Sequence, residues 1–203
     1  MNRWLFATNN SHKIEEAQDI LKDFAQIISP KDLGISIDVE ETADSFKGNA
    51  LLKALAFHKE TGLPCFADDS GLCVNQLNGA PGIHSARYAQ IEGQPVNHQA
   101  NNEKLLHALN EAQDRSAYFI TVICAIGFSE EPVFFEGRVY GTIDNQTKGE
   151  KGFGYDPLFI PEGYDQTFAE LGESVKNTLS HRSRALTEMR AFLQNLPNTN
   201  LLF

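Results

Sequence analysis

The sequence has few cysteines and no excess of basic residues, and both shortages narrow the classes of protein that it can encode. Its three cysteines among 203 residues are an odd number and include no C-x-x-C pair, which argues against a disulfide framework or a zinc ribbon. Each lies in an apolar or strand-like context, so we expect reduced thiols in the core. Lys and Arg number 17 against 27 Asp and Glu, a net charge of −10. A protein of this sign repels a phosphate backbone, so we expect no nucleic-acid partner.

Long apolar runs are missing as well. Residues 1–7 lead into the polar Thr8-Asn9-Asn10 too soon to form the apolar core of a signal peptide. No run approaches the roughly 20 apolar residues that span a bilayer, so we expect a cytosolic protein without a membrane span. The apolar content of 41% is near the globular norm and suffices for one domain or two small lobes. A few Lys and Arg gathered in one pocket, with a divalent cation, can still bind a phosphorylated small molecule.

Hydrophobic periodicity predicts a mixed α/β fold. A short buried strand at 4–7 passes through a polar loop into a helix, which makes a βα unit. A second helix is expected at 45–59 with Ser45 as its N-cap, and a strand follows at 64–67. The further elements expected are a helix at 102–109, strands at 117–128 and 133–143 joined by a hairpin connection at 130–132, a Gly and Lys-rich loop at 147–154, a short strand at 157–160 and a helix at 180–193. We expect the middle hairpin region to form a second lobe and the tail at 197–200 to fray.

Two lysines are candidate phosphate ligands. Thr8, Asn10 and Lys13 lie where the first strand passes into its helix, and a helix N-terminus offers unpaired N–H groups and a positive dipole end. The alternative, which this segment alone favours, is an ordinary capped turn with a solvated lysine. Lys53 shares a face of the second helix with Asn49, four residues away. Lys53 either extends to water past its apolar neighbours or meets a phosphate.

Two acidic pairs are candidate magnesium ligands. Glu40-Glu41 precedes the second helix, and Asp68-Asp69 stands at the end of the strand expected at 64–67. Magnesium takes oxygen ligands and keeps several waters, so one or two carboxylates and substrate phosphate oxygens complete its shell. A carboxylate beside the ion could also accept the proton of an attacking water. The glutamate pair by itself fits a solvated turn, whereas two like charges directly after an apolar strand need a cation nearby.

The segment 152–157, Gly-Phe-Gly-Tyr-Asp-Pro, is a candidate base-binding loop. Its glycines let the backbone approach a flat ligand, and Phe153 and Tyr155 offer rings for stacking. The same sequence is also typical of a buried aromatic turn. No G-x-G-x-x-G spacing follows the first strand, which argues against a dinucleotide site.

Three hydrogen-bond donors, Lys176, His181 and Arg182, gather near the start of the final helix, where Ser180 is the expected N-cap. They could bind the carbonyl edge of a base or a phosphate. The alternative is a basic helix turn that pairs with nearby glutamates.

Read together, these motifs resemble the inosine triphosphate pyrophosphatase family over nearly the whole chain. Six blocks match in order and approximate spacing: Thr8-x-Asn10-x-x-Lys13, Glu41-Thr42 with Phe46-x-x-Asn49-Ala50-x-x-Lys53-Ala54, Ala67-Asp68-Asp69-Ser70-Gly71-Leu72, Gly79-Ala80-Pro81-Gly82-Ile83-x-Ser85-Ala86-Arg87-Tyr88, Gly152-Phe153-Gly154-Tyr155-Asp156-Pro157 and Ser180-His181-Arg182. The resemblance implies an elongated, mixed-sheet α/β fold of two lobes with a central substrate cleft, formed by a single domain over residues 1–203, and a homodimer.

The resemblance also implies the roles of individual residues. Asp69 is implied to be the catalytic carboxylate and a Mg²⁺ ligand, with Glu40 or Glu41 as the other acidic ligand. The residues implied to bind the substrate are Thr8, Asn9, Asn10, Ser11, His12, Lys13, Lys53 and Ser70 at the triphosphate and Phe153, Gly154, Tyr155, Asp156, Lys176, His181 and Arg182 at the base. The implied reaction is attack of water on the α-phosphorus of ITP, dITP or XTP, which releases pyrophosphate and removes deaminated purines from the nucleotide pool.

Two other functions compete with this interpretation. One is a Maf-like pyrophosphatase that acts on modified pyrimidine or methylated nucleotides, and the intact blocks at 153–156 and 180–182 argue against it. The other is a regulator that senses triphosphates without cleaving them. Such a regulator would not need Asp69 and a paired glutamate beside a phosphate loop.

Overall fold

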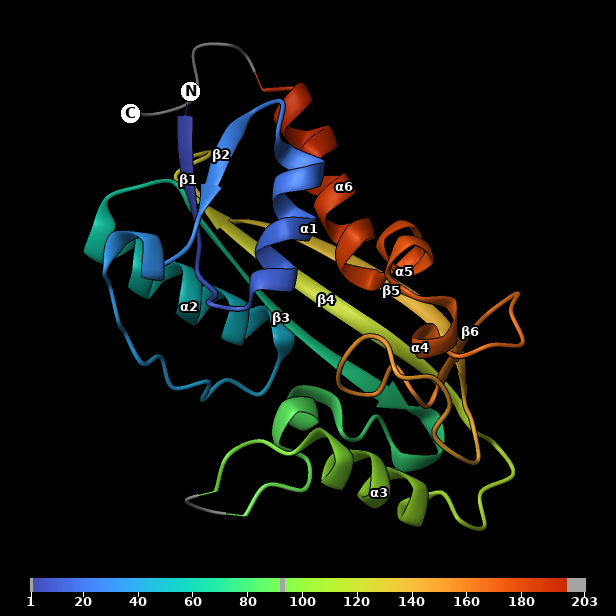
Figure 1. The fold of residues 1–203 in the computed structure, drawn as a ribbon. Helices are drawn as coiled ribbons and strands as arrows, with labels where there is room; N and C mark the ends of the chain where they lie inside the picture. The colour runs from blue at the N-terminus through green and yellow to red at the C-terminus, as the bar shows by residue number, and fades with distance from the viewer. Residues whose placement is uncertain (1, 92–93, 197–203) are drawn as a thin grey trace. The chain divides into compact units, whose positions relative to one another are not determined.

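The computed structural model describes residues 2–91 and 94–196 and contains one six-stranded mixed sheet with helices packed on it (Figure 1). The strand order is β2-β1-β3-β4-β5-β6; β1 is parallel to β2 and β3, and β5 is antiparallel to β6. In chain order the elements are β1 (Asn2–Phe6), α1 (Ser11–Leu21), β2 (Ala25–Ile28), the 3-10 helix η1 (Lys31–Leu33), α2 (Phe46–Thr61), β3 (Cys65–Val74), η2 (Asn75–Leu77), η3 (Gly82–Arg87), α3 (His98–Ala108), β4 (Ser116–Ile126), β5 (Val133–Ile143), β6 (Phe159–Pro161), α4 (Phe168–Leu171), α5 (Glu173–Leu179) and α6 (His181–Gln194). The tail at 197–200, which we expect to fray, lies outside the described residues.

The chain divides into two compact units. Unit 1 consists of Met1–Asp69, Thr121–Gly137 and Arg182–Phe203, and unit 2 consists of Ser70–Ile120 and Arg138–His181. The division crosses β3, β4 and β5, so each of these strands has residues in both units. The middle hairpin is therefore shared between the units and does not form a lobe of its own, because its two strands are long enough, at 11 residues each, to serve both cores.

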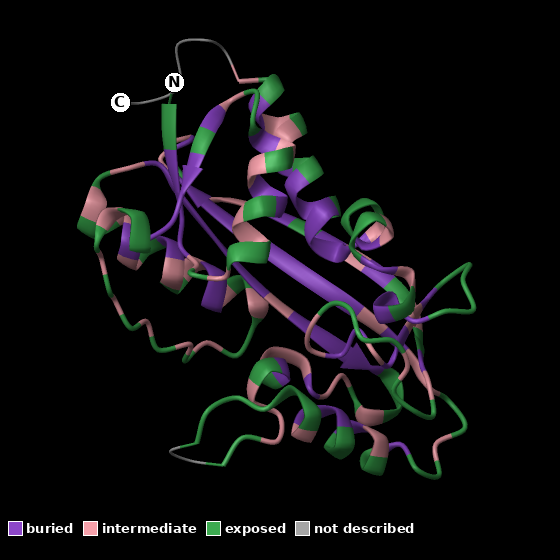
Figure 2. Cartoon of the chain, viewed as in Figure 1, coloured by how far each residue is buried: buried purple, intermediate pink, exposed green. Residues whose placement is uncertain are grey.

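In unit 1, helices cover both faces of the sheet. Successive strand residues point to opposite faces, so Trp4, Phe6 and Phe66 pack on one side with apolar residues of α1 and α6. Leu5 and Cys65 pack on the other side with α2. Figures 1 and 2 show this arrangement, with strands that are mostly buried apart from the start of β1 and single exposed residues in β2 and β5, and helices that are buried along one stripe. The two buried faces explain why consecutive residues are apolar at 4–6 in β1 and at 65–67 in β3.

Unit 2 has an apolar core of its own. This core is built from residues of β3, β4, β5, β6, α3, α4 and the segments that connect them: Leu72, Val74, Leu105, Leu109, Ala117, Phe119, Val139, Ile143, Tyr155, Leu158, Phe159 and Phe168. Three phenylalanines lie at its centre. The ring of Phe159 is 4.7 Å from that of Phe119 and 5.4 Å from that of Phe168, between centroids. Such aromatic contacts stabilise a core beyond the area that they bury.

Several predicted elements are confirmed with their boundaries. Helix α2 begins after Ser45, whose side chain accepts a hydrogen bond from the backbone N–H of Gly48, and β5 covers the predicted residues. The errors are at short or polar segments. The four-residue strand β2 and the short helices α4 and α5 were not predicted, because so few residues carry no clear period. Strand β3 continues to Val74, past the end that we placed before Asp68.

The cysteines are free and buried, as expected. Burial raises the pKa of the Cys124 thiol to about 12, which leaves very little reactive thiolate at neutral pH. Among the residues that the structure describes, no helix has the length and apolar character needed to span a membrane.

Candidate active site

Asp68 and Asp69 lie inside β3, not at its end, and this changes how the pair works. Because adjacent strand residues point to opposite faces, the two carboxylates enter different surroundings. Asp68 meets cations of α1 and α6, whereas Asp69 meets α2. The pair that seemed to form one acidic site is therefore divided between the two faces of the sheet.

Asp68 is held by two cations. The Nζ of Lys13 lies 2.9 Å from its Oδ1, and the Nε of Arg182 lies 3.2 Å from its Oδ2. Arg182 in turn binds Glu16, with Nη1 2.8 Å from Oε2. Burial alone would raise the pKa of Asp68, but Lys13 and Arg182 outweigh burial and hold that pKa well below its usual range. The cation that an acidic pair beside an apolar strand requires is thus present.

The loop before α1 is a capped turn, as one of the two alternatives predicts, but its lysine has an ionic partner. Asn10 is the N-cap, since its side chain accepts from the backbone N–H of Lys13 at 3.3 Å, and its own N–H donates to Thr8 Oγ1 at 3.2 Å. Lys13 is not solvated as a capped turn would suggest, because its ammonium pairs with Asp68. Burial lowers the pKa of Lys13, and Asp68 partly offsets this. The other residues predicted for this loop are exposed: Asn9, Ser11 and His12.

Asp69 belongs to a second charged cluster, which we call the Asp69 cluster and which consists of Asp69, Glu41, Lys53 and Asn49. The Nζ of Lys53 lies 2.8 Å from Glu41 Oε1 and 3.9 Å from Asp69 Oδ1. The Nδ2 of Asn49 donates to Asp69 Oδ2 at 3.1 Å. Burial raises the pKa of Asp69 to about 6, with Lys53 opposing and Glu41 adding to the shift. A buried carboxylate with a pKa near neutrality is suited to accept a proton. Ser70, also predicted to bind substrate, follows in β3 and is half-buried.

The Asp69 cluster also distinguishes the two glutamates that the sequence left open. Glu41 reaches Lys53, and through this lysine it is joined to Asp69, whereas Glu40 is exposed. Over the described ranges, no group of three or more His, Cys, Asp or Glu side chains is arranged to hold a metal ion. Two carboxylates are nevertheless the donor set that Mg²⁺ uses when water and phosphate oxygens supply its other ligands. Glu41 and Asp69 therefore fit that ion.

In unit 2, Asp156 closes the aromatic loop. Its Oδ2 accepts from the backbone N–H of Phe153 at 2.8 Å and pairs with Lys176. Gly152 has a φ of +80°, and a Cβ there would lie 2.3 Å from Asp156 Oδ2, so only glycine fits this turn. The Nζ of Lys176 is also 4.1 Å from the centroid of the Phe153 ring. A carboxylate, an ammonium and an aromatic face thus lie together in unit 2.

The Tyr155 ring is part of the core of unit 2, so the prediction that it stacks on a base is wrong for this structure. Tyr155 is 4% exposed and packs in the apolar cluster, and its hydroxyl donates to the carbonyl oxygen of Ser85 at 2.9 Å. The buried aromatic turn describes this residue correctly. Phe153 is half-buried, and its stacking on a base remains a prediction. The backbone of Gly154 accepts from Asn102 Nδ2 at 3.1 Å.

The three donors near the final helix have different partners. Lys176 lies in α5 and pairs with Asp156, not with a glutamate as the alternative of a basic helix turn predicted. His181 is the first residue of α6, and its ring stacks on Phe119 with centroids 4.9 Å apart and planes 12° apart. Arg182 is buried in unit 1 between two carboxylates. Its predicted contact with a base remains a prediction.

Comparison with known proteins identifies the family of the chain. The profile of the Ham1 family matches residues 4–192. The chain belongs to the Ham1 family. A dITP/XTP pyrophosphatase of Porphyromonas gingivalis is 50% identical over 194 residues, which are 95% of this chain and 98% of that protein. A dITP/XTP pyrophosphatase of Clostridium perfringens is 45% identical over 205 residues, covering 97% and 99% of the two chains.

The solved structures also agree with the fold. The Ham1 protein of Staphylococcus aureus superposes with a TM-score of 0.87 at 42% identity, over 95% of this chain and 98% of that one. This likeness confirms the predicted mixed-sheet α/β fold.

Two polar residues of this Ham1 chain were given no role from the sequence, although both are central to unit 1. Glu16 is 9% exposed and binds Arg182, and Asn49 is 0% exposed and binds Asp69. Each stands beside a fully buried alanine on its helix, Ala17 or Ala50. A polar residue within the apolar stripe of a helix is costly unless it is paired, so this placement was the signal that could have found them.

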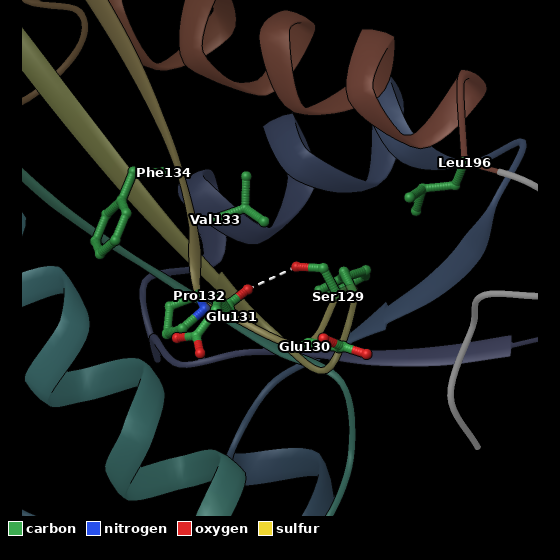
Figure 3. A pocket seen from close by; sticks show the side chains of 8 residues that line it. Ser129, Glu130, Glu131, Pro132, Val133, Phe134 and Leu196 are labelled. Carbon is green, nitrogen blue, oxygen red and sulfur yellow. Dashed lines mark hydrogen bonds between the residues drawn. The ribbon is translucent and has the colours of Figure 1, made fainter.

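The Ham1 chain has a hollow of about 690 Å³ at the connection between β4 and β5 in unit 1 (Figure 3). It is lined by Phe128, Ser129, Glu130, Glu131, Pro132, Val133, Phe134 and Leu196. The Ser129 hydroxyl donates to the carbonyl oxygen of Glu131 at 2.6 Å. Two glutamates and no Lys or Arg line this hollow, so it repels a polyphosphate. We therefore place the candidate active site at the Asp69 cluster.

Proposed function

We propose that this Ham1-family chain is a Mg²⁺-dependent pyrophosphatase that hydrolyses ITP, dITP and XTP to the monophosphate and pyrophosphate. The observation that carries the proposal is the Asp69 cluster, in which the carboxylates of Asp69 and Glu41 meet at the ammonium of Lys53. This is a donor set for a hard cation beside a group that binds phosphate. The names of the curated relatives support the choice of substrate.

In the proposed reaction, Asp69 accepts the proton of the water that attacks the α-phosphorus. A new bond forms between the water oxygen and this phosphorus, the bond to the bridging oxygen breaks, and pyrophosphate leaves. With a pKa raised to about 6, Asp69 is ionised at neutral pH and remains basic enough for the task. Glu41 and Asp69 would hold Mg²⁺, which when bound polarises phosphate oxygens and stabilises the charge that develops on them.

The lysines of unit 1 bind the triphosphate in this proposal. The pKa of Lys53 is raised, because Asp68 and Asp69 outweigh its burial, so this side chain stays cationic. Lys13 pairs with Asp68 at the N-terminus of α1, where the positive end of the helix dipole also attracts anions. Preorganised cations of this kind supply much of the stabilisation in phosphoryl transfer.

Base recognition is proposed for residues of unit 2. Phe153 stacks on the purine, and Lys176 donates to the carbonyl at position 6 of hypoxanthine or xanthine. Adenine carries an amino group there, which leaves a donor facing a donor, at a cost of about 1–3 kcal/mol for each group left unpaired. Arg182 is proposed as a second donor. This role requires its guanidinium to leave Glu16 or Asp68, which it binds in unit 1.

We also propose that the enzyme works in the cytosol as a homodimer. The free, buried cysteines support the compartment, because disulfides are rare in the cytosol. The resemblance to the inosine triphosphate pyrophosphatase family supports the dimer. Size-exclusion chromatography with light scattering distinguishes a dimer from a monomer of 22.6 kDa.

Release of pyrophosphate from ITP, dITP, XTP, GTP and ATP in the presence of Mg²⁺ tests the function. We expect the three deaminated substrates to exceed ATP by about a hundredfold or more in kcat/KM. Chelation by EDTA should abolish activity, and Mg²⁺ should restore it. In H₂¹⁸O the label should enter the monophosphate alone, because water attacks the α-phosphorus. Binding of ITP without any release of pyrophosphate would identify a sensor and overturn the proposal.

A further inference from the structure

We infer that Asn49 is a positioning residue that ties together Asp69 and the segment carrying Glu41, and so sets the separation of the two acidic ligands. The inference rests on the proposed function, since it assigns a second layer to the same site. Asn49 lies in the first turn of α2 and is 0% exposed. Its amide makes one contact with each of the two parts of the site.

The contacts of Asn49 leave its amide only one orientation. The Oδ1 accepts from the backbone N–H of Ala43 at 3.0 Å. A backbone N–H can only donate, so the amide oxygen must face Ala43 and the NH₂ group must face Asp69. The Nδ2 donates to Asp69 Oδ2 at 3.1 Å. A buried amide that is satisfied at both ends is held rigidly.

For Asp69, this contact decides which carboxylate oxygen is turned toward the rest of the cluster. Asn49 binds Oδ2, and Oδ1 is the oxygen that lies 3.9 Å from the Nζ of Lys53. A neutral donor holds the carboxylate in place without cancelling its charge, whereas a cation at position 49 would compete with a metal ion. Partners that orient a ligand in this way usually alter metal affinity or activity by about 10–100-fold when they are changed.

For Glu41, the contact anchors a segment that has no helix or strand of its own. Glu41 lies between η1 and α2, and Ala43 is two residues farther along. A second observation shows that Ala43 is pressed against α2: a Cβ added to Gly48 would lie 2.5 Å from the Cβ of Ala43. Residue 48 must therefore lack a side chain for the segment to lie where Asn49 can bind it.

Two substitutions separate these contacts. Asn49→Leu keeps the approximate volume and removes both hydrogen bonds, while Gly48→Ala leaves Asn49 in place and pushes Ala43 away. Alanine is better than glycine inside a helix by about 1 kcal/mol, so a defect in Gly48→Ala does not come from helix propensity. The added Cβ also lies 3.1 Å from Oγ of the N-cap Ser45, and thermal unfolding reports any weakening of that cap. If Asn49 acts on Glu41 through Ala43, adding Gly48→Ala to Asn49→Leu should change little further.

A matched control comes from unit 2. Asn101 is 2% exposed; it also accepts from one backbone N–H, that of Ala89 at 2.7 Å, and it donates to two nearby backbone oxygens, those of Ala86 at 2.9 Å and Ser85 at 3.4 Å. Asn101→Leu therefore removes an equally buried amide that contacts no acidic ligand. Thermal unfolding of each variant reports the general cost of losing a buried amide.

Binding of Mn²⁺, followed by electron paramagnetic resonance, is the deciding measurement, because it does not depend on turnover. The titration uses the full chain with an ITP analogue that carries a methylene between the α- and β-phosphorus. We expect Asn49→Leu to weaken Mn²⁺ binding about tenfold or more and Gly48→Ala to weaken it by a smaller factor. Both should lower kcat with Mg²⁺ and ITP and change KM much less, whereas Asn101→Leu should leave Mn²⁺ binding unchanged.

Mn²⁺ binding by Asn49→Leu that matches Asn101→Leu would overturn the inference. If Asn49→Leu does not fold, Gly48→Ala decides, and wild-type Mn²⁺ binding in that variant would overturn the anchoring of the Glu41 segment. Failure of the proposed function looks different, because the wild-type chain would then release no pyrophosphate at all.

Discussion

Asp68 and Asp69 are neighbours in β3, yet their carboxylates face opposite sides of the sheet and have pKa values shifted in opposite directions. Two cations, Lys13 and Arg182, hold Asp68 ionised. Burial raises the pKa of Asp69 to about 6. When the surroundings of two carboxylates shift their pKa values in opposite directions, the two groups usually have different roles in catalysis. In the proposed mechanism, Asp68 is a permanent counter-ion for Lys13, and Asp69 is available as a base.

Asp69→Asn should remove nearly all turnover and make the metal-free protein more stable at pH 8. The folded pKa of about 6 lies above the ordinary value of 3.8, so the folded state binds more protons between these values. The stability contributed by Asp69 is therefore present below pH 4 and lost as the pH rises through 6. This difference of about two pKa units corresponds to at most about 3 kcal/mol in the free energy of unfolding. Thermal unfolding in EDTA should show the variant above the wild type at pH 8 and level with it near pH 4, and turnover close to that of the wild type would remove Asp69 from the mechanism.

Asp68→Asn should act in the opposite direction on stability. Its folded pKa lies well below the ordinary value, so its contribution is present above about pH 4 and lost as the pH falls below that. Removing the carboxylate leaves Lys13 and Arg182 close together without their shared counter-ion, and breaking a buried pair costs about 3–5 kcal/mol. The unfolding midpoint of the variant at pH 8 should be lower than that of the wild type. The difference between the two midpoints should become smaller at acid pH. A gap that widens in acid would contradict this assignment.

Lys13→Ala should raise KM and lower kcat for ITP without changing the preference among bases. Lys13 lies in the first turn of α1 in unit 1, and in the proposed mechanism it supplies positive charge to the triphosphate. Steady-state kinetics with ITP and GTP test this, because both substrates carry the same triphosphate. A collapse of the ratio of ITP to GTP activity would instead assign Lys13 to base recognition.

Phe153→Ala should lower kcat/KM for ITP and for ATP by similar factors, because stacking is nearly indifferent to which purine is present. Tyr155→Phe is the matched control in the same loop. It removes the hydrogen bond to Ser85 from a buried ring, so it should cost about 1 kcal/mol of stability and leave the ratio of ITP to ATP activity unchanged. A loss confined to ITP in Phe153→Ala would show that the ring does more than stack.

Arg182→Ala should destabilise unit 1, because it leaves Glu16 and Asp68 without the guanidinium that binds both. The expected cost is about 3–5 kcal/mol. If Arg182 also donates to the carbonyl at position 6, the ratio of ITP to ATP kcat/KM should narrow by roughly tenfold, which is about 1.4 kcal/mol of lost discrimination. Kinetics must be measured well below the lowered midpoint of unfolding. Equal losses on both substrates would restrict Arg182 to its place between the two carboxylates.

Features that depend on neighbouring residues were predictable from the sequence. Ser45 caps α2 through a contact three residues away, and Asn10 caps α1 in the same manner. Such contacts are set by backbone geometry within one helical turn, so the residue types and their spacing determine them. The six blocks indicated the family because their order and spacing can be read from the sequence without knowledge of the fold. The apolar part of the strand before Asp68 was also predicted correctly, but its continuation from Asp68 to Val74 was not.

The tertiary structure alone decided which charges meet. Asp68 pairs with Lys13, 55 positions away in the sequence, and with Arg182, 114 positions away. Asn49 binds Asp69, 20 positions away. No local pattern encodes these pairings. They follow from strand alternation, which sends adjacent carboxylates to opposite faces of the sheet, and from the packing of α1 and α6 on one face and α2 on the other. The same packing buried Tyr155 and brought Glu41, not Glu40, to Lys53, because burial and long-range contact are properties of the assembled core.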